Sequence, residues 1–418
     1  MNNQPAQPAA AASSAWLARP QRRLGAVGLV LLLTVANIIV PFSLDMYTPS
    51  VPALPAYFGT TASVVNLTIV GFFLFFTVGM LVFGPISDKL GRKPVLLGGL
   101  VLYTLGSACC ALAGGIWALV AFRVVQALGA GATSAVSMAL VKDCFAAQVR
   151  AKMLAVLQIA AVVGPVAAPL IGGFILTFGT WRTTFAVLAV VGAACCALAV
   201  LFDESLPPHE RTREGVLGSL AHLAVPARNK GLMMTLLVAS LFSVPFMAYI
   251  ACGSYVYVDF FGTTQQVYTY YFAATAALTV LGPLGYLRFS HLTTPRRLTH
   301  VLLGVSLAAG LALLALGQAG PLAFCASFAV FAVAEAMIRP YTTDIMLAQE
   351  DRDAGATSAL INFAVNVFGV LGMVLIMLPW PNYVVGLGVV TVGSVALAAL
   401  VWARMLTMKT GRVREFER

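Results

Sequence analysis

The sequence predicts an all-α integral membrane protein in which two bundles of six transmembrane helices surround a central cavity. Hydrophobic residues make up 60% of the 418 residues and charged residues only 10%, whereas a soluble domain is about one quarter charged. Long apolar runs follow one another along the chain, and a spanning helix needs ~20 such residues. These runs do not alternate as the strands of a membrane β-barrel do, so helices are predicted.

Twelve apolar runs predict twelve spanning helices. The first six are expected at residues 24–46, 62–84, 94–113, 116–141, 151–178 and 182–202. The other six are expected at residues 232–258, 267–288, 298–317, 320–348, 355–378 and 383–405. The expected domains are therefore a disordered cytoplasmic tail (1–23), an N-terminal six-helix bundle (24–202), a cytoplasmic linker (203–231), a C-terminal six-helix bundle (232–405) and a cytoplasmic tail (406–418).

The basic residues predict the orientation of the chain. The net charge is +10, and Lys and Arg gather in alternate connections, for example at Arg92 and Lys93, while the other connections hold only Arg182 and Asp259. Connections rich in Lys and Arg stay in the cytoplasm. Both termini and the linker are therefore expected to be cytoplasmic, in a bacterial inner membrane. The basic residues lie in short gaps between apolar runs, which favours lipid contact over nucleic-acid binding.

The composition argues against an enzyme or a metal protein. The seven cysteines mostly lie inside apolar runs, and the four histidines do not cluster, so neither a disulfide framework nor a metal-ligand spacing is evident. No nucleophile–base set and no phosphate-binding loop can be identified. We expect a monomeric transporter without a cofactor, apart from the proton as coupling ion.

Two short patterns recur in order along the chain. The sequence Phe-Gly-Thr-Thr stands at residues 58–61 and again at 261–264, and Gly-Pro stands at 84–85 and again at 282–283. In both cases the two copies are separated by about half the length of the chain. They suggest duplicated halves, which is a transporter architecture.

Residues 84–93 read Gly-Pro-Ile-Ser-Asp-Lys-Leu-Gly-Arg-Lys. This segment resembles the G-x-x-x-D-[RK]-x-G-[RK]-[RK] signature of the major facilitator superfamily. Gly84 would let a neighbouring helix approach closely, Gly91 would supply a tight turn, and Arg92 and Lys93 would hold the loop inside. The resemblance implies that Asp88 latches the start of the helix predicted at 355–378 and favours the outward-open state. The alternative is a basic turn between any two spans.

A second pattern lies in the helix predicted at 116–141. Residues 123–131 read Arg-Val-Val-Gln-Ala-Leu-Gly-Ala-Gly and resemble the superfamily's R-x-x-Q-G-x-G-A pattern, with Ala127 in place of the usual glycine. A cation inside an apolar helix costs ~2.5–3.5 kcal/mol. Arg123 therefore needs a partner or water, unless it extends toward the outer membrane surface.

A third pattern marks the helix predicted at 151–178. Residues 164–173 read Gly-Pro-Val-Ala-Ala-Pro-Leu-Ile-Gly-Gly and resemble the motif of the antiporter branch, without its leading glycine. Prolines bend a helix and glycines permit close contact, so we expect a seal against residues 282–285; a kinked helix without directional meaning is the alternative. The residues expected to act are Gly164, Pro165, Pro169, Gly172 and Gly173.

A fourth pattern points to proton coupling. Residues 45–52 read Asp-Met-Tyr-Thr-Pro-Ser-Val-Pro and look like the Asp-Met-Tyr-x-Pro-x-x-Pro segment of the bicyclomycin and chloramphenicol-resistance exporters. In that family the position of Asp45 is a membrane carboxylate that exchanges a proton for substrate. Carboxyl groups in poorly hydrated cavities can bind and release protons near neutral pH. The alternative is an exposed Asp45 at the outer interface.

The helix predicted at 320–348 carries charges that are unusual for this family. Glu335 and Arg339 are four residues apart and share a helix face, so they form either a structural ion pair or a second proton or cation site facing the cavity. Asp344 is expected nearer the cytoplasm. The further residues expected to contact substrate are Asn37, Tyr47, Gln126, Tyr249, Tyr255, Tyr257, Arg339, Asn362 and Asn366.

These observations predict a proton-coupled efflux antiporter that exports drugs or other small amphipathic molecules by alternating access. The expected proton-coupling residues are Asp45, Glu335 and Arg123. The alternative is a proton-coupled exporter of one metabolite, such as an amino acid derivative or a siderophore-like compound, because the Glu335 and Arg339 charges would suit a zwitterionic or anionic substrate. The expected partners are a small-molecule substrate, protons and membrane lipid, and no nucleic acid.

Overall fold

The structure is a computed structural model that describes residues 16–19, 21–212, 218, 221, 223–289, 292–349 and 354–407. Across these ranges the regular structure is helical, apart from one antiparallel bridge between Leu17 and Phe145. Among the described residues, twelve helical segments are long and apolar enough to cross a membrane. The predicted all-α membrane class is therefore confirmed.

The first six spanning segments lie close to the predicted ranges. They are α2 (Gly25–Asp45) with η1 (Thr48–Ala53) and α3 (Leu54–Phe58), then α4 (Ala62–Leu90), α5 (Arg92–Ala111), α6 (Ile116–Cys144), α7 (Ala147–Ile175) and α8 (Trp181–Leu201). The main difference concerns α4, which continues to Leu90 instead of ending at residue 84. Its last residues are polar, so the hydropathy pattern misses a helix that continues beyond the apolar run. Gly91, with φ of 107°, ends this region.

The second half begins after η2 (Pro208–Glu210) and α10 (Ala224–Ala227). Its elements are α11 (Lys230–Tyr255) with η3 (Val256–Phe260), α12 (Gln265–Leu278), α13 (Leu281–Phe289), α14 (Pro295–Leu316) with η4 (Gly317–Ala319), α15 (Pro321–Gln349), α16 (Ala354–Leu375) and α17 (Tyr383–Thr407). The helix predicted at 267–288 is divided into α12 and α13. Pro283 has no N–H to donate to the carbonyl group of Thr279, four residues earlier, which explains the break.

The chain forms two compact units that do not coincide with its two halves. One unit takes its residues from Met1–Asp45, Phe75–Pro165 and Gly179–Val216, and the other from Met46–Leu74, Val166–Phe178 and Leu217–Arg418. The segments η1, α3, the start of α4 and the end of α7 therefore pack with the second half of the sequence.

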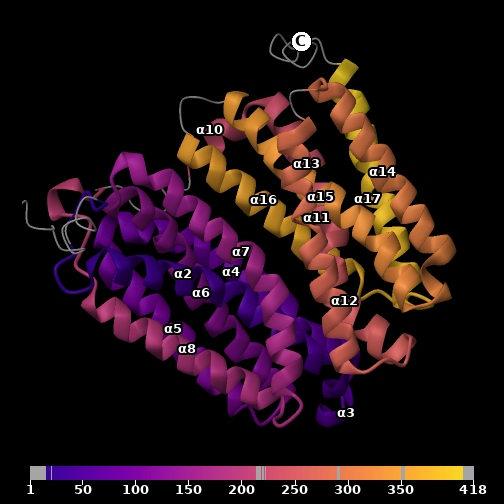
Figure 1. The fold of residues 1–418 in the computed structure, drawn as a ribbon, viewed down its shortest axis with the longest axis horizontal. Helices are drawn as coiled ribbons and strands as arrows, with labels where there is room; N and C mark the ends of the chain where they lie inside the picture. The colour runs from indigo at the N-terminus through magenta and orange to yellow at the C-terminus, as the bar shows by residue number, and fades with distance from the viewer. Residues whose placement is uncertain are drawn as a thin grey trace, which may run out of the picture. The chain divides into compact units, whose positions relative to one another are not determined.

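In the first unit, α5 lies along α6 and α8 (Figure 1). Small residues of α6 allow this approach. A Cβ built on Gly129 would overlap the backbone of Gly99 and Tyr103 in α5, and one built on Gly131 would overlap the backbone of α4. The glycines of the 123–131 pattern thus serve helix packing, as small residues do in membrane bundles.

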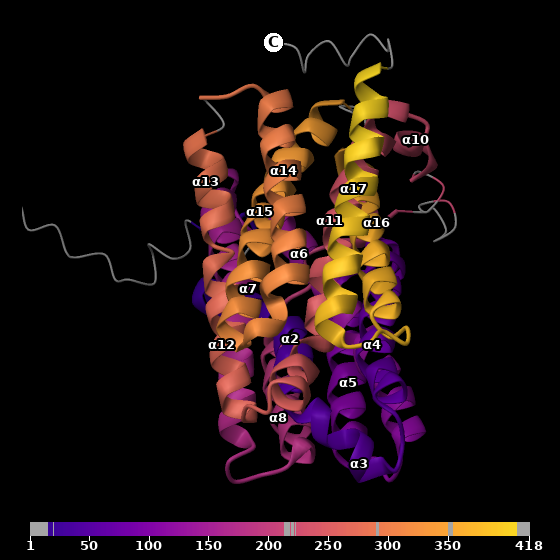
Figure 2. The same cartoon turned by 90° about the vertical axis from the view of Figure 1, so that its right-hand side faces the viewer.

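In the second unit, α11 packs against α15, α16 and α17, and α14 lies beside α15 and α17 (Figure 2). The span formed by α11 and η3 (Lys230–Phe260) is the most buried of the twelve described spans: 89% of its most apolar stretch lies inside the protein. Aromatic side chains fill part of this core: Phe242 of α11 stacks on Phe331 of α15, with 6.0 Å between ring centroids.

Residues 16–19 of the predicted N-terminal tail make backbone hydrogen bonds. Residues 1–23 were expected to be a disordered tail, yet the Ala18 N–H donates to the Cys144 carbonyl group over 2.8 Å, and the Ala146 N–H donates to the Trp16 carbonyl group over 3.0 Å. The connection between α6 and α7 supplies backbone groups for this pairing, which side-chain polarity does not reveal. Of the predicted tails, residues 1–15, 20 and 408–418 lie outside the described residues, as do 213–217, 219, 220 and 222 of the predicted linker.

Candidate functional site

Arg123 of α6 is fully buried in the first unit. Its Nη1 atom donates to the Ser43 carbonyl oxygen over 2.8 Å and to Oε1 of Gln126 over 2.9 Å. The guanidinium group also lies 5.5 Å from the ring centre of Phe185 in α8. The alternative that Arg123 extends to the membrane surface is therefore wrong.

Two neighbouring helices extend this polar network. Nε2 of Gln126 donates to Oγ of Ser107 in α5 over 2.7 Å. The hydroxyl groups of Ser43 and Tyr103 lie 2.8 Å apart. Because buried polar groups need partners, this network fixes α2, α5 and α6 around the Arg123 guanidinium group.

Asp45 is the last residue of α2, two residues after Ser43, and is only 4% exposed. The alternative of an exposed aspartate at the interface is therefore wrong. Since Arg123 is bound to the Ser43 carbonyl group, one compact unit holds a buried acid and a buried cation on adjoining segments.

The prolines and glycines of α7 pack against the end of the first span. A Cβ built on Gly164 would lie 2.6 Å from Cγ of Pro41 in α2, and one built on Gly172 would overlap the carbonyl group of Met46. Both glycines therefore permit approaches that a side chain would prevent. Pro165 and Pro169 lie between them in α7.

The motif contacts the eighth span at a different position from the one expected. A Cβ built on Gly173 would lie 2.8 Å from Cγ2 of Thr269, in α12. Gly282, at the expected position, instead packs against Ala336 and Met337 of α15. The motif therefore packs against the helix predicted at 267–288, but near its start and not at residues 282–285.

Contacts between hydroxyl groups also join η1 to α12 and the residue before η1 to α4. The Tyr268 hydroxyl group in α12 donates to Oγ1 of Thr48 over 3.1 Å, and both residues are fully buried. The Tyr47 and Thr68 hydroxyl groups lie 3.1 Å apart. We name the first of these pairs the Thr48–Tyr268 contact. It joins residues 220 positions apart in the sequence.

Glu335 and Arg339 form an ion pair within α15. Nε of Arg339 lies 2.5 Å from Oε1 of Glu335, whose side chain is 4% exposed, whereas that of Arg339 is 46% exposed. The guanidinium group also lies 6.0 Å from the ring centre of Phe246 in α11. The two charges thus share a face, as their spacing predicts.

The predicted tyrosines of the second unit lie in an aromatic core. The Tyr249 ring stacks on Phe328 at 4.2 Å, and the Tyr257 ring stacks on Tyr271 at 4.9 Å. The Tyr255 ring lies 5.6 Å from that of Tyr383. Tyr249, Tyr255 and Tyr257, which lie in α11 and η3, are almost fully buried, so in this structure they contribute chiefly to packing.

The predicted asparagines are more accessible. Asn37 of α2 and Asn366 of α16 are partly buried, and Asn362 is exposed. The Asn362 side-chain amide donates to the Ser358 carbonyl group over 3.0 Å. Their roles in substrate binding remain predictions.

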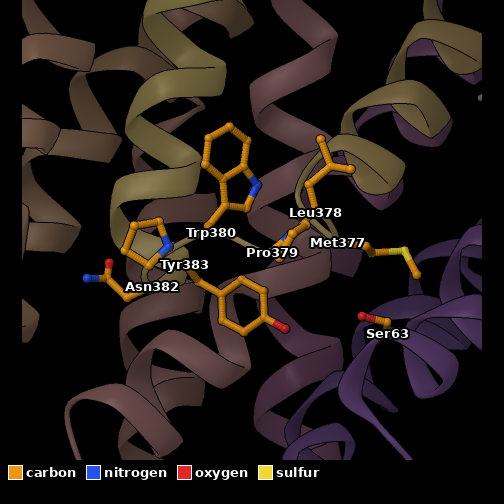
Figure 3. A pocket seen from close by; sticks show the side chains of 8 residues that line it. Ser63, Met377, Leu378, Pro379, Trp380, Asn382 and Tyr383 are labelled. Atoms are coloured by element: carbon orange, nitrogen blue, oxygen red, sulfur yellow. The ribbon is translucent and has the colours of Figure 1, made fainter.

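A cavity of about 520 Å³ opens at the connection between α16 and α17. Figure 3 shows the Tyr383 hydroxyl group turned toward Ser63, and the Trp380 ring above the Tyr383 ring. None of the predicted site residues lines it. Across the described residues, no three His, Cys, Asp or Glu side chains are grouped in a way that could hold a metal ion.

The connection between α4 and α5 holds a charge network in the first unit. Arg92 pairs with Asp88 at 2.6 Å and with Asp143 of α6 at 2.8 Å, and donates to Oγ of Ser87 over 2.6 Å. The Asp88 side chain is 48% exposed. Its predicted latch partner, the start of α16, belongs to the other unit, so the latch remains a prediction. Within the described part of the first unit, no neighbouring helix lies within 4 Å of a Cβ built on Gly84, and a close approach by a helix of the other unit stays a prediction.

Glu204 binds the N-terminus of α5. Its carboxylate accepts the backbone N–H groups of Arg92 over 2.9 Å and of Lys93 over 3.1 Å. A Cβ on Gly91 would lie 2.5 Å from Oε2 of Glu204 and 2.7 Å from Nη2 of Arg211. Gly91 is therefore required both by its positive φ and by this contact.

Sequence reasoning missed Asp143, Glu204 and Phe246. The first two had a signal: each is an acid at the end of an apolar run, beside segments rich in Lys and Arg. Phe246 had none, because one phenylalanine in an apolar span is indistinguishable from its neighbours.

Comparisons with known proteins agree with this architecture. The family description of the Major Facilitator Superfamily matches residues 33–373. An uncharacterized MFS-type transporter, YdgK, of Bacillus subtilis is 29% identical over 340 residues, which cover 80% of this chain and 85% of the relative. A chloramphenicol resistance protein of Pseudomonas aeruginosa is 36% identical over 174 residues, covering 41% of this chain and 42% of the relative.

The fold is also that of a solved transporter. A crystal structure of a D-xylose-proton symporter superposes with a TM-score of 0.69 at 16% sequence identity, covering 89% of this chain and 96% of that one. The match over most of the chain confirms the resemblance carried by residues 84–93, and the predicted transporter class is confirmed with it. The chain belongs to the Major Facilitator Superfamily.

Proposed function

We propose that this transporter is a proton-coupled efflux antiporter that exports drugs or other small amphipathic molecules by alternating access. A relative named for chloramphenicol resistance supports drug export. The observation that carries proton coupling is the burial of Asp45, at 4% exposure, in the unit that also buries Arg123.

The chemistry follows from the two forms of a carboxyl group. A buried carboxylate is costly unless it is neutralised by a proton or paired with a cation. Substrate binding and proton binding at Asp45 therefore compete, with Arg123 supplying a fixed positive charge beside the site. A ligand shifts the equilibrium between two states only through its different affinities for them, so the inward proton gradient drives export when protonation and substrate favour opposite states.

The remaining expectations complete this proposal. The protein works in a bacterial inner membrane with both termini in the cytoplasm, which the distribution of basic residues supports. It acts as a monomer and needs no cofactor, because the coupling ion is the proton itself. Asp88, Arg92 and the α7 motif act in switching between states.

Proton release on substrate addition tests the coupling. The purified full chain, in weakly buffered detergent solution with a pH-sensitive dye, should release protons when chloramphenicol is added. Asp45→Asn should abolish this release and lower export from cells, because an amide cannot exchange a proton. Asp259→Asn removes an exposed acid near the end of α11 and serves as the control, with parental behaviour expected. Release and export at the parental level in Asp45→Asn would refute the assignment.

A further inference from the structure

We propose that Glu335 and Phe246 form a binding site for positively charged amphipathic substrates, which Arg339 occupies as a tethered cation until a substrate displaces it. This inference rests on the proposed export function and names a substrate class for it. It concerns the second unit alone, and does not depend on the role of Asp45.

Arg339 makes the two contacts that an organic cation would need. Its Nε atom lies 2.5 Å from the Glu335 carboxylate, and its guanidinium group lies 6.0 Å from the centre of the Phe246 ring. A carboxylate and an aromatic face within reach of one positive group are the usual means of recognising organic cations. The site is therefore already arranged for a cation, with a side chain of the protein in it.

The exposure of the two partners identifies which one can leave. The Glu335 side chain is 4% exposed, whereas the Arg339 side chain is 46% exposed. Arg339 has a long, flexible stem and can move its charge into water. Glu335 cannot, and a buried acid left without a partner is strongly destabilising. Exchange of one cation for another keeps Glu335 neutralised throughout.

The same reasoning disfavours an anionic substrate. An anion bound to Arg339 would draw the guanidinium group away from Glu335 and leave that carboxylate buried and unpaired. It would also approach the face of Phe246, which carries partial negative charge. A cation avoids both costs.

The position of the pair indicates a site on the interior of the bundle. Phe246 belongs to α11, the most buried of the described spans. An arginine facing lipid is expensive, so we infer that the exposed part of the Arg339 side chain, which is 46% exposed, faces water and not lipid. Substrate can reach Glu335 by the same route.

Two probes of different charge test this site. Ethidium is a permanent aromatic cation and chloramphenicol is uncharged, and the affinity of each is measured on the purified full chain by fluorescence or calorimetry. Glu335→Gln should weaken ethidium binding about tenfold or more and leave chloramphenicol binding unchanged. Phe246→Leu should weaken ethidium binding several-fold. Arg339→Gln should strengthen ethidium binding, because the competing cation is gone.

Matched variants separate this site from a structural ion pair. Asp344→Asn removes another carboxylate of α15, which accepts a hydrogen bond from the Tyr286 hydroxyl group over 2.6 Å, and should leave ethidium affinity unchanged. Arg339→Lys keeps a tethered cation and should preserve the parental affinity. If Arg339→Gln is too unstable to assay, the double variant Glu335→Gln with Arg339→Gln removes both charges and should bind ethidium as weakly as Glu335→Gln alone.

The proposal is overturned if Glu335→Gln binds ethidium like the parent, or if Arg339→Gln weakens ethidium binding as much as Glu335→Gln does. Binding of fluorescein, an aromatic anion, that is lost only in Arg339→Gln would likewise overturn it and indicate an anion site. In each of these cases proton release by the parent and its loss in Asp45→Asn could still be observed, so failure of this site is distinguishable from failure of the antiport proposal.

Discussion

Arg123 and Glu335 are buried charges that are stabilised in different ways. Arg123 of α6 donates to a carbonyl group of α2 and to the nearby Gln126 side chain. Glu335 is neutralised by Arg339 one turn further along its own helix. Because charges in a span need partners, the sequence could predict that both residues are compensated. Helical spacing predicted Arg339 as the partner of Glu335. The sequence did not predict that Arg123 binds the Ser43 carbonyl group, since a backbone acceptor leaves no mark in a sequence.

Close packing at single glycines gives a prediction about stability. A Cβ built on Gly106 of α5 would lie 2.6 Å from the Gln126 backbone nitrogen, whereas one built on Gly98 in the same helix would meet no described atom within 4 Å. Gly106→Ala should force α5 away from α6 and lower the free energy of unfolding by about 1–3 kcal/mol. It should also disturb Gln126, a partner of Arg123.

Gly98→Ala is the matched control for this prediction. Alanine stabilises a helix interior by roughly 0.5–1 kcal/mol relative to glycine, and the open position at Gly98 allows that gain. Thermal unfolding of both variants in detergent measures the difference. Equal melting temperatures for Gly106→Ala and Gly98→Ala would contradict the packing described here.

At the scale of elements, hydropathy predicted the spans well because each apolar run must match the thickness of the bilayer. It failed where a helix continues beyond its apolar run or breaks within it. The polar end of α4 reads as a loop, and the break between α12 and α13 is invisible to an average over apolar residues. The role of Glu204 was also missed, because a cap formed by a residue 112 positions away has no local signature.

The Glu204 cap yields a prediction for α5. Its carboxylate accepts N–H groups from the first turn, where the helix dipole favours negative charge. Glu204→Ala should therefore lower the free energy of unfolding by about 1–2 kcal/mol, and Glu204→Gln, which keeps an acceptor oxygen, should lower it less. Thermal melts of the purified chain provide the measurement.

Glu210 provides the control for Glu204. It lies on the same segment and pairs with Arg19 at a more exposed position. Exposed ion pairs contribute about 0–1 kcal/mol to stability, so the melting temperature of Glu210→Ala should lie close to that of the parent. A Glu210→Ala variant that melts as low as Glu204→Ala would mean that the segment stabilises the protein through its charge as a whole, and not through a cap on α5.

At the scale of the whole molecule, the sequence predicted two sets of six helices but not the compact units that the chain forms. The end of the first span, the start of α4 and the end of α7 pack with the second half. Their glycines and hydroxyl groups indicated contact, yet neither residue type specifies a partner. Under the proposed alternating access, we expect this grouping to change between states, so that one sequence must be compatible with more than one grouping.

The Thr48–Tyr268 contact tests alternating access directly. If transport requires residues of the first span to separate from α12, then holding them together must stop it. In a chain whose seven cysteines are replaced, Thr48→Cys with Tyr268→Cys should be joined by a short bifunctional thiol reagent, and export should then fall to background.

The pair Thr299→Cys with Tyr341→Cys is the control, because those hydroxyl groups are also buried and lie 2.9 Å apart, but they join α14 and α15. These helices follow one another in the sequence and the proposed separation is between the first span and α12, so cross-linking α14 to α15 should leave export near the parental rate. Export that continues through the cross-linked Thr48–Tyr268 pair would show that this contact stays closed during transport, and would exclude it as a gate.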